Sequence, residues 1–108
     1  MTLYQILTDP EHGVQIPVVY SHFDKKKGDA PKEPPYIAYL GNGQDTFQAD
    51  DTHYYTQNRY QLEYYFTEKD EQEEAVIESV LLDNGFLYEK SEDIFIEDEG
   101  VFVIYYQI

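Results

Sequence analysis

The chain has 108 residues, a net charge of −15 and no cysteine. This length predicts a single domain over residues 1–108, and the lack of cysteine excludes disulfides and thiolate metal sites. The acidity argues against a surface for nucleic-acid phosphate or anionic lipid, because both need a basic face. Twelve tyrosines and six phenylalanines favour a folded domain, since disordered chains contain few aromatic residues.

The N-terminal segment predicts a short helix followed by a strand. Thr2 can cap a helix over residues 3–7, which ends before Pro10 because the residue preceding a proline disfavours helical backbone. We expect a strand at 18–23. It is placed after Pro17 because proline has no N–H to donate to a strand ladder.

Two long polar segments flank the next strand. Residues 24–34 have no periodic apolar pattern and predict a loop, which holds the only basic cluster of the chain. Residues 35–40 are almost entirely apolar, as in a central strand. We expect glycines 41 and 43 to end this strand, and residues 41–53 to form a second long loop.

Residues 59–84 are the stretch around which the fold is organised. Their first part belongs to a predicted strand that begins near Tyr54. Its side chains alternate with period two up to Phe66. One face carries Tyr60, Leu62, Tyr64 and Phe66, and the other carries Gln61, Glu63 and Tyr65.

The second half predicts an amphipathic helix at about 70–84. Thr67 or Asp70 can cap its start, and Asn84-Gly85 supplies a left-handed end. The apolar stripe consists of Val76, Ile77, Val80 and Leu81, and we expect the opposite side to carry Glu71, Glu74 and Glu78.

The C-terminal part predicts further strands at 86–91, 94–96 and 101–107, with a turn at 98–100. The last strand is apolar on both faces and should lie inside the sheet. The predicted fold class is α+β: a small, mostly antiparallel sheet of about four to five strands packed on one main helix, with a short N-terminal helix.

No catalytic, cofactor-binding or metal-binding residues are predicted. The three histidines, His12, His22 and His53, lack metal-ligand spacing. The acids of residues 92–99 lack the alternation and the glycine of a calcium loop. Neither a cysteine nucleophile nor a Gly-x-Ser-x-Gly elbow is present. We therefore expect a protein that is not an enzyme and uses no cofactor.

Tyrosine doublets point instead to an interaction surface. Neighbouring strand residues face opposite sides, so a doublet puts an aromatic ring on both faces of the sheet. One face packs on the helix, and a loop of the same chain or another subunit covers the other. The lysine cluster is either a solvated loop or a contact to an acidic neighbouring subunit. The candidate subunit-contact residues are Lys25, Lys26, Lys27, Phe47, Tyr54, Tyr55 and Tyr65.

Four segments carry a family resemblance. Residues 33–40 read Glu-Pro-Pro-Tyr-Ile-Ala-Tyr-Leu, which resembles a Pro-Pro-Tyr-Ile-x-Tyr-Leu pattern of small phage and prophage structural proteins of Gram-positive bacteria. Three further segments are similar in order and spacing, and with the first they cover most of the chain from about residue 16: Phe47-x-Ala49-Asp50 with 58–65, Glu68-Lys69-Asp70 with the acidic helix, and 86–92 with 103–106.

The family is similar to head–tail joining proteins of the tail-terminator or tail-completion type. The resemblance implies a small antiparallel or mixed sheet on one or two helices and a non-enzymatic ring, expected to be hexameric, at the head-proximal end of the tail tube. Its partners would be copies of itself, the tail tube protein and a neck or connector protein, with DNA passing through without specific binding. It would reside in the host cytoplasm during assembly and then in the virion. Terminator and other neck components remain alternatives.

An acidic DNA mimic that inhibits a DNA-processing enzyme is the runner-up function. Such a protein would need carboxylates spaced like phosphates along one elongated face. No apolar run approaches the roughly 18 residues of a membrane span, and the N-terminus has no basic region of a signal peptide.

Overall fold

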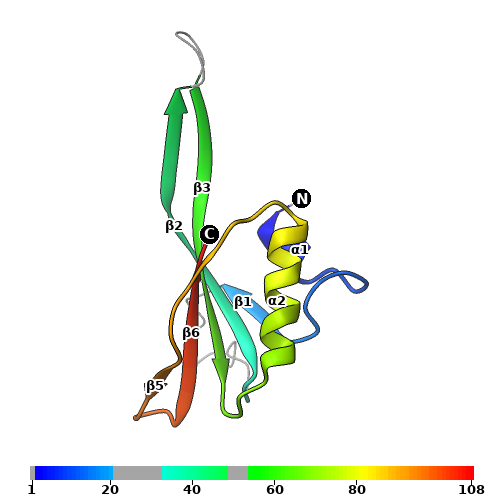
Figure 1. The fold of residues 1–108 in the computed structure, drawn as a ribbon, viewed down its shortest axis with the longest axis vertical. Coiled ribbons are helices and arrows are strands. Elements are labelled where there is room, and N and C mark those ends of the chain that lie inside the picture. The colour runs from blue at the N-terminus through cyan, green and yellow to red at the C-terminus, as the bar shows by residue number, and fades with distance from the viewer. Residues whose placement is uncertain (1, 21–32, 49–53) are drawn as a thin grey trace.

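The computed structural model describes residues 2–20, 33–48 and 54–108, with 47–48 and 54–55 described by their backbone alone. Two helices and six strands form it (Figure 1). In chain order they are α1 (Leu3–Leu7), β1 (Val18–Tyr20), β2 (Tyr36–Gln48), β3 (Tyr54–Phe66), α2 (Glu71–Asp83), β4 (Glu89–Lys90), β5 (Ile94–Ile96) and β6 (Val101–Gln107).

All six strands belong to one sheet of order β1-β2-β3-β6-β4, with β5 also paired to β6. The first pair is parallel and the others are antiparallel. The α+β class is confirmed, with β6 inside the sheet as predicted. The sixth strand arises because β4 and β5 pair with successive parts of the same edge of β6. The strand predicted at 86–91 shortens to β4, because β6 ends at Gln107 and offers no partner to residues 86–88.

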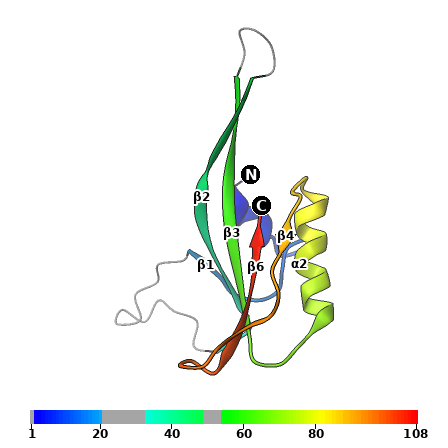
Figure 2. The same cartoon turned by 60° about the vertical axis from the view of Figure 1, so that its left-hand side comes forward.

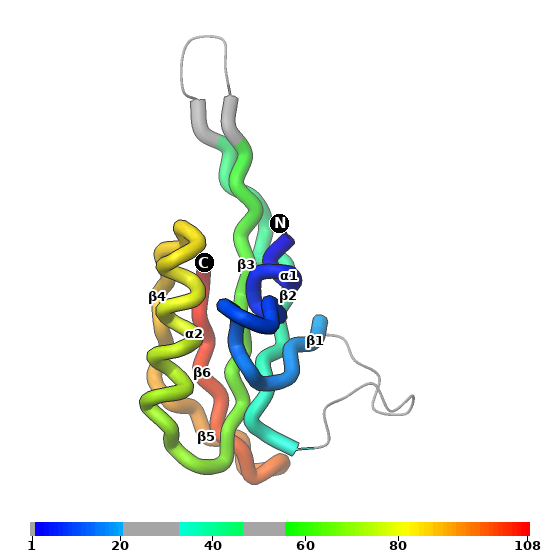
Figure 3. Tube along the Cα trace, turned by 90° about the vertical axis from the view of Figure 1, so that its right-hand side faces the viewer, coloured from blue at the N-terminus to red at the C-terminus, as the bar shows by residue number. Residues whose placement is uncertain are grey.

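Both helices lie on the same side of the sheet (Figures 2 and 3). Leu62, Tyr64 and Phe66 alternate along β3 toward that side and are buried, as the period-two pattern predicts. Of their partners in β6, Tyr106 and Ile104 are buried and Phe102 is partly buried. The core between helices and sheet includes Leu7, Ile37, Leu62, Tyr64, Phe66, Ile77, Leu81, Ile104 and Tyr106.

The ends of α2 follow from its sequence. The Asp70 side chain caps the first turn by accepting from the backbone N–H groups of Gln72 and Glu73. At the other end Gly85 has a φ of 84°, a left-handed conformation that glycine adopts without steric cost. The N–H groups of Gly85 and Phe86 then donate to the carbonyls of Leu82 and Leu81, which closes a Schellman turn.

The prediction for the acidic side of α2 was wrong at two positions. Glu74 is 3% exposed and Glu78 is half-buried. Their positions relative to Ile77 and Leu81 explain this, since residues at i, i+3, i+4 and i+7 share one face of a helix. Val76, predicted to be in the apolar stripe, is 40% exposed.

Lysines from outside the helix neutralise these carboxylates. Lys90 of β4 lies 2.8 Å from Glu74 and 2.9 Å from Glu78. Lys69 lies 2.7 Å from the other oxygen of Glu74.

The phenols of Tyr88 and Tyr106 donate to Glu78. Burial alone would raise the pKa of Glu78, but hydrogen bonds from Lys90, Tyr106 and Tyr88 outweigh it and lower this pKa.. We call Lys69, Glu74, Glu78 and Lys90 the ion-pair cluster.

The second long loop predicted at 41–53 was also wrong over its described part. Strand β2 continues through Gly41 to Gln48 and pairs with β3 as far as Tyr54, with a register shift between Gly41 and Gln44. Residues 42–48 and 54–59 form a two-stranded arm, which projects from the rest of the molecule (Figure 1). The segment is polar, and its described side chains at 44–46 and 56–58 lie outside the hydrophobic core.

The bulge in the arm requires a glycine. Gly43 has a φ of 83°, whereas Gly41 has no positive φ, and a methyl group added at either position would meet nothing within 4 Å. We expect Gly43→Ala to destabilise the arm by about 1 to 2 kcal/mol, the cost of left-handed backbone for alanine. Faster amide hydrogen exchange at residues 44–46 and 56–58 would show this. Gly41→Ala is the matched control, and equal effects of the two variants would contradict the prediction.

Candidate interaction face

The side of the sheet opposite α1 and α2 is called the open face. Its side chains come from the strand positions that alternate with the core: Gln61, Glu63 and Tyr65 of β3 lie beside Gln107, Tyr105 and Val103 of β6. Tyr36, Ala38 and Leu40 of β2 lie on the other flank of β3. This face is not uniformly exposed to solvent, because Val103 and Ala38 are almost fully buried.

A continuous row of hydrogen bonds crosses the open face. The Asn42 side-chain amide donates to Gln107 at 2.7 Å, and the Gln107 amide donates to Gln61 at 2.7 Å. Gln61 donates to one oxygen of Glu63 at 3.3 Å, and the Tyr65 phenol donates to the other at 2.7 Å. We call these five residues the amide strip. It links three strands, and it leaves amide and carboxylate atoms with further capacity for hydrogen bonds to a partner.

The Tyr65 end of the strip is aromatic. The rings of Tyr65 and Tyr36 stack with centroids 4.9 Å apart and planes 25° apart. Burial raises the pKa of the Tyr65 phenol, and its hydrogen bond to Glu63 raises it further. The phenol therefore stays protonated at neutral pH and keeps donating to Glu63. A fixed donor next to an apolar ring is the combination that makes tyrosine frequent in protein interfaces.

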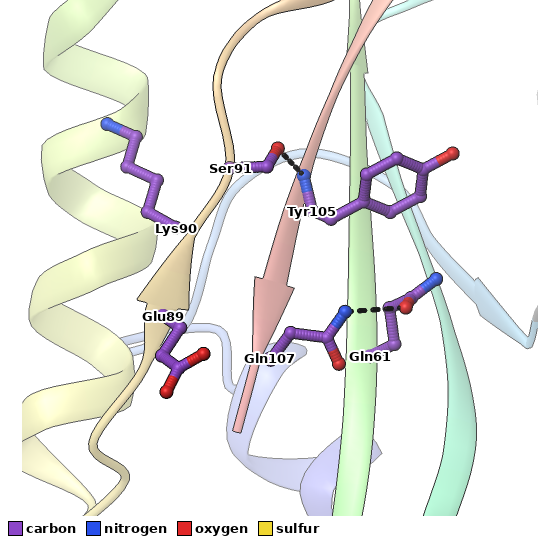
Figure 4. Close-up of a pocket in the computed structure, with 6 residues that line it drawn as sticks. All are labelled: Gln61, Glu89, Lys90, Ser91, Tyr105 and Gln107. Atoms are coloured by element: carbon purple, nitrogen blue, oxygen red, sulfur yellow. Dashed lines mark hydrogen bonds between the residues drawn. The ribbon is translucent and has the colours of Figure 1, made fainter.

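A depression of about 350 Å³ lies at the other end of the strip, between β4 and β6. Figure 4 shows Gln61 and Gln107 hydrogen-bonded on one wall, while Glu89 and Ser91 come from the segment around β4. Ser91 accepts from the backbone N–H of Tyr105 at 2.8 Å. The Lys90 side chain points toward α2 in this view, consistent with its ion pairs.

The described side chains of this face offer hydrogen-bonding groups and aromatic rings. Its one carboxylate within the strip, Glu63, is held by Tyr65 and Gln61. In the part of the chain that the structure describes, no three histidine, aspartate or glutamate side chains gather as a metal site would require. No helix among the described residues is long and apolar enough to cross a membrane.

The structure gives the positions of some predicted contact residues, and their role in contacts stays a prediction. Tyr65 lies on the open face, within the amide strip. Phe47, Tyr54 and Tyr55 lie in the arm, where Phe47 pairs with Tyr55 along the backbone, and their side chains are outside the description. Lys25, Lys26 and Lys27 lie outside the described residues altogether.

The amides of the strip could not be predicted from the sequence. The alternation along β3 placed Gln61 on the correct face, but three glutamine and asparagine residues spaced 19 and 46 positions apart carry no local signal. Only the register of β3 with β6, together with the bulge in β2, brings Asn42, Gln61 and Gln107 into contact. Comparison with protein-family models, curated proteins and solved structures gives no match for this chain.

Proposed function

We propose that this chain is a non-enzymatic phage virion assembly protein at the head-proximal end of the tail, of the tail-terminator, tail-completion or neck-connector type. In this proposal copies of the chain form a ring, which stops growth of the tail tube and meets the neck. The serial motifs of residues 33–106 suggest the class. The fold supports it, because the resemblance implies a small antiparallel or mixed sheet packed on one or two helices, and this domain has one mixed sheet and two helices.

The observation that carries the proposal is the pairing of two unlike surfaces on one small domain. One is the open face with its amide strip, and the other is the arm, which extends the molecule to 51 Å against 30 and 27 Å in the other directions. A ring closes through heterologous contacts, in which one surface of a subunit meets a different surface of the next. Among the described residues, the polar–aromatic sheet face and the projecting hairpin are two separate surfaces that would meet that requirement.

The net charge of −15 fits the same role. An acidic inner wall would repel DNA and let it pass through the ring without adhering. The neutralised carboxylates of the ion-pair cluster argue against a DNA mimic along that face of α2, since Glu74 and Glu78 point inward to lysines.

A charge reversal on the open face tests the proposal. Glu89 is exposed beside the depression, and Glu71 is exposed on α2. In a phage carrying an early stop codon in this gene, we expect unjoined heads and tails of abnormal length by negative-stain microscopy. Supplying the wild-type protein or the Glu71→Arg variant to this phage should restore plaque formation. Supplying the Glu89→Arg variant should give a plaque titre at least tenfold lower than the wild-type protein gives.

Two results would contradict this scheme at different levels. Normal virions without the protein would exclude the assembly role, and altered activity of a DNA-processing enzyme in that mutant would favour the acidic inhibitor. Equal complementation by the two variants would instead exclude the open face around Glu89 as the subunit contact.

A further inference from the structure

A second recess lies away from the open face, where β3 turns into α2. This turn is at the end of the molecule opposite the arm (Figure 1). We call the recess the turn cleft. Its volume is about 330 Å³, at the lower end of the range for ligand sites, so it suits a side chain better than a cofactor. It is lined by Pro34, Pro35, Tyr64, Phe66, Thr67, Glu68, Lys69, Asp70 and Glu73.

Two polar groups at this cleft lack partners within the described protein. The oxygen Oε1 of Glu73 is buried and accepts no hydrogen bond. Tyr64 is 1% exposed and lines the cleft, and none of the hydrogen bonds among the described residues involves its phenol. Buried polar groups are nearly always hydrogen-bonded, so the unpartnered oxygen of Glu73, with a phenol lining the same cleft, points to a missing ligand.

The charge around the cleft identifies the chemistry of that ligand. Lys69 is already engaged by Glu74 and Asp93, and the carboxylate of Asp70 accepts from the first turn of α2. Among the described residues no cation pairs with Glu73, which lines the cleft together with Tyr64. Burial, followed by the charges of Glu73, Asp70 and Glu74, raises the pKa of Tyr64 to about 12. Burial also raises the pKa of Glu73, and the charge of Asp70 adds to it. A cation would relieve both groups.

We propose that the turn cleft binds an arginine side chain presented by a partner protein. A guanidinium carries five N–H donors in a planar fork, so it can donate to Glu73 Oε1 and to the Tyr64 phenol oxygen together. Its plane can also lie against the two prolines that line the cleft, because a guanidinium is weakly hydrated and stacks on flat apolar groups. Lysine offers a strongly hydrated point charge and fits such walls less well. This inference does not depend on the proposed assembly role.

The binding test uses N-acetyl-arginine amide as the probe and its neutral isostere, N-acetyl-citrulline amide, as the ligand control. Backbone NMR titration of the full chain should show saturable shifts in residues 64–73 with the arginine probe and none with citrulline. Glu73→Gln should weaken binding about tenfold, the loss of one charge-assisted hydrogen bond. Tyr64→Phe should weaken it less, and Glu71→Gln, the matched exposed control, should leave it unchanged.

Stability separates this role from a structural one. A carboxylate with a raised folded pKa opposes folding above that pKa, and the penalty disappears below the unfolded value near 4.5 where both states are protonated. Glu73→Gln should therefore raise the urea midpoint at pH 7 and leave it unchanged near pH 3, while it weakens arginine binding. The proposal is overturned if the arginine probe gives no saturable shifts, if citrulline binds equally, or if Glu73→Gln binds like the wild type.

Discussion

Replacement of Lys90 by methionine is expected to lower the free energy of unfolding by about 2 to 3 kcal/mol. Breaking a buried ion pair costs roughly 3 to 5 kcal/mol, because the remaining charge is left uncompensated. The expected loss is smaller here, since the Lys90 side chain is 33% exposed and Glu74 keeps its contact to Lys69. Urea unfolding followed by circular dichroism would measure it.

The double variant Lys90→Met with Glu74→Met makes this prediction sharper. Removing both charges eliminates the desolvation cost of Glu74, and apolar replacements of buried ion pairs are often neutral or stabilising. We expect the double variant to recover at least half of the stability lost in Lys90→Met. Arg59→Met is the control for an ordinary pair: Arg59 is 37% exposed and meets Asp45 at 3.0 Å, so its loss should cost less than about 0.5 kcal/mol. Additive losses in the double variant would refute a shared buried cluster.

Ile77→Ala is expected to cost about 3 kcal/mol, a large fraction of the roughly 5 to 15 kcal/mol that stabilises a typical domain. Ile77 is completely buried between α2 and the sheet, so truncation leaves a cavity that the surrounding side chains fill only in part. The urea midpoint should fall without a change in slope, which would show that the surface exposed on unfolding is unaltered.

The neighbouring residue provides the control for this prediction. Val76 is on the same helix and 40% exposed, so Val76→Ala should change stability by no more than about 0.5 kcal/mol. The comparison also tests the orientation of α2 directly. Similar losses at the two positions would mean that the helix packs on the sheet through a wider stripe that includes Val76.

Local sequence patterns predicted the helices and strands of this fold better than they predicted which residues those elements contact. Alternation along Tyr60–Phe66 and the signals at Asp70 and Gly85 act within a few residues, and the structure follows them. Glu74 was misplaced because its burial depends on Lys90, which is 16 positions away and reaches it only once β4 pairs with β6. The arm was misjudged because a solvated two-stranded hairpin has no buried face and therefore no apolar alternation for a sequence to show.

The candidate sites were harder to predict for the same reason. The amide strip needs the β3–β6 register, and the turn cleft needs Pro34 to approach the start of α2. Neither juxtaposition has a signature in consecutive residues. The face of the sheet that carries Tyr65 could be predicted, because neighbouring residues of a strand point to opposite faces.

The pairing at the margins of the sheet has a consequence for solubility. Among the described strands, the outer ones are β1 at one margin, with three residues, and β4 and β5 at the other, with two and three. Between β4 and β5 the Ser91 hydroxyl, rather than a strand carbonyl, receives the Tyr105 N–H. Outside the arm, where the outer edges of β2 and β3 have no described partner strand, these short, interrupted borders offer a foreign strand little to template on, which is how natural sheets resist fibril growth at high local concentration.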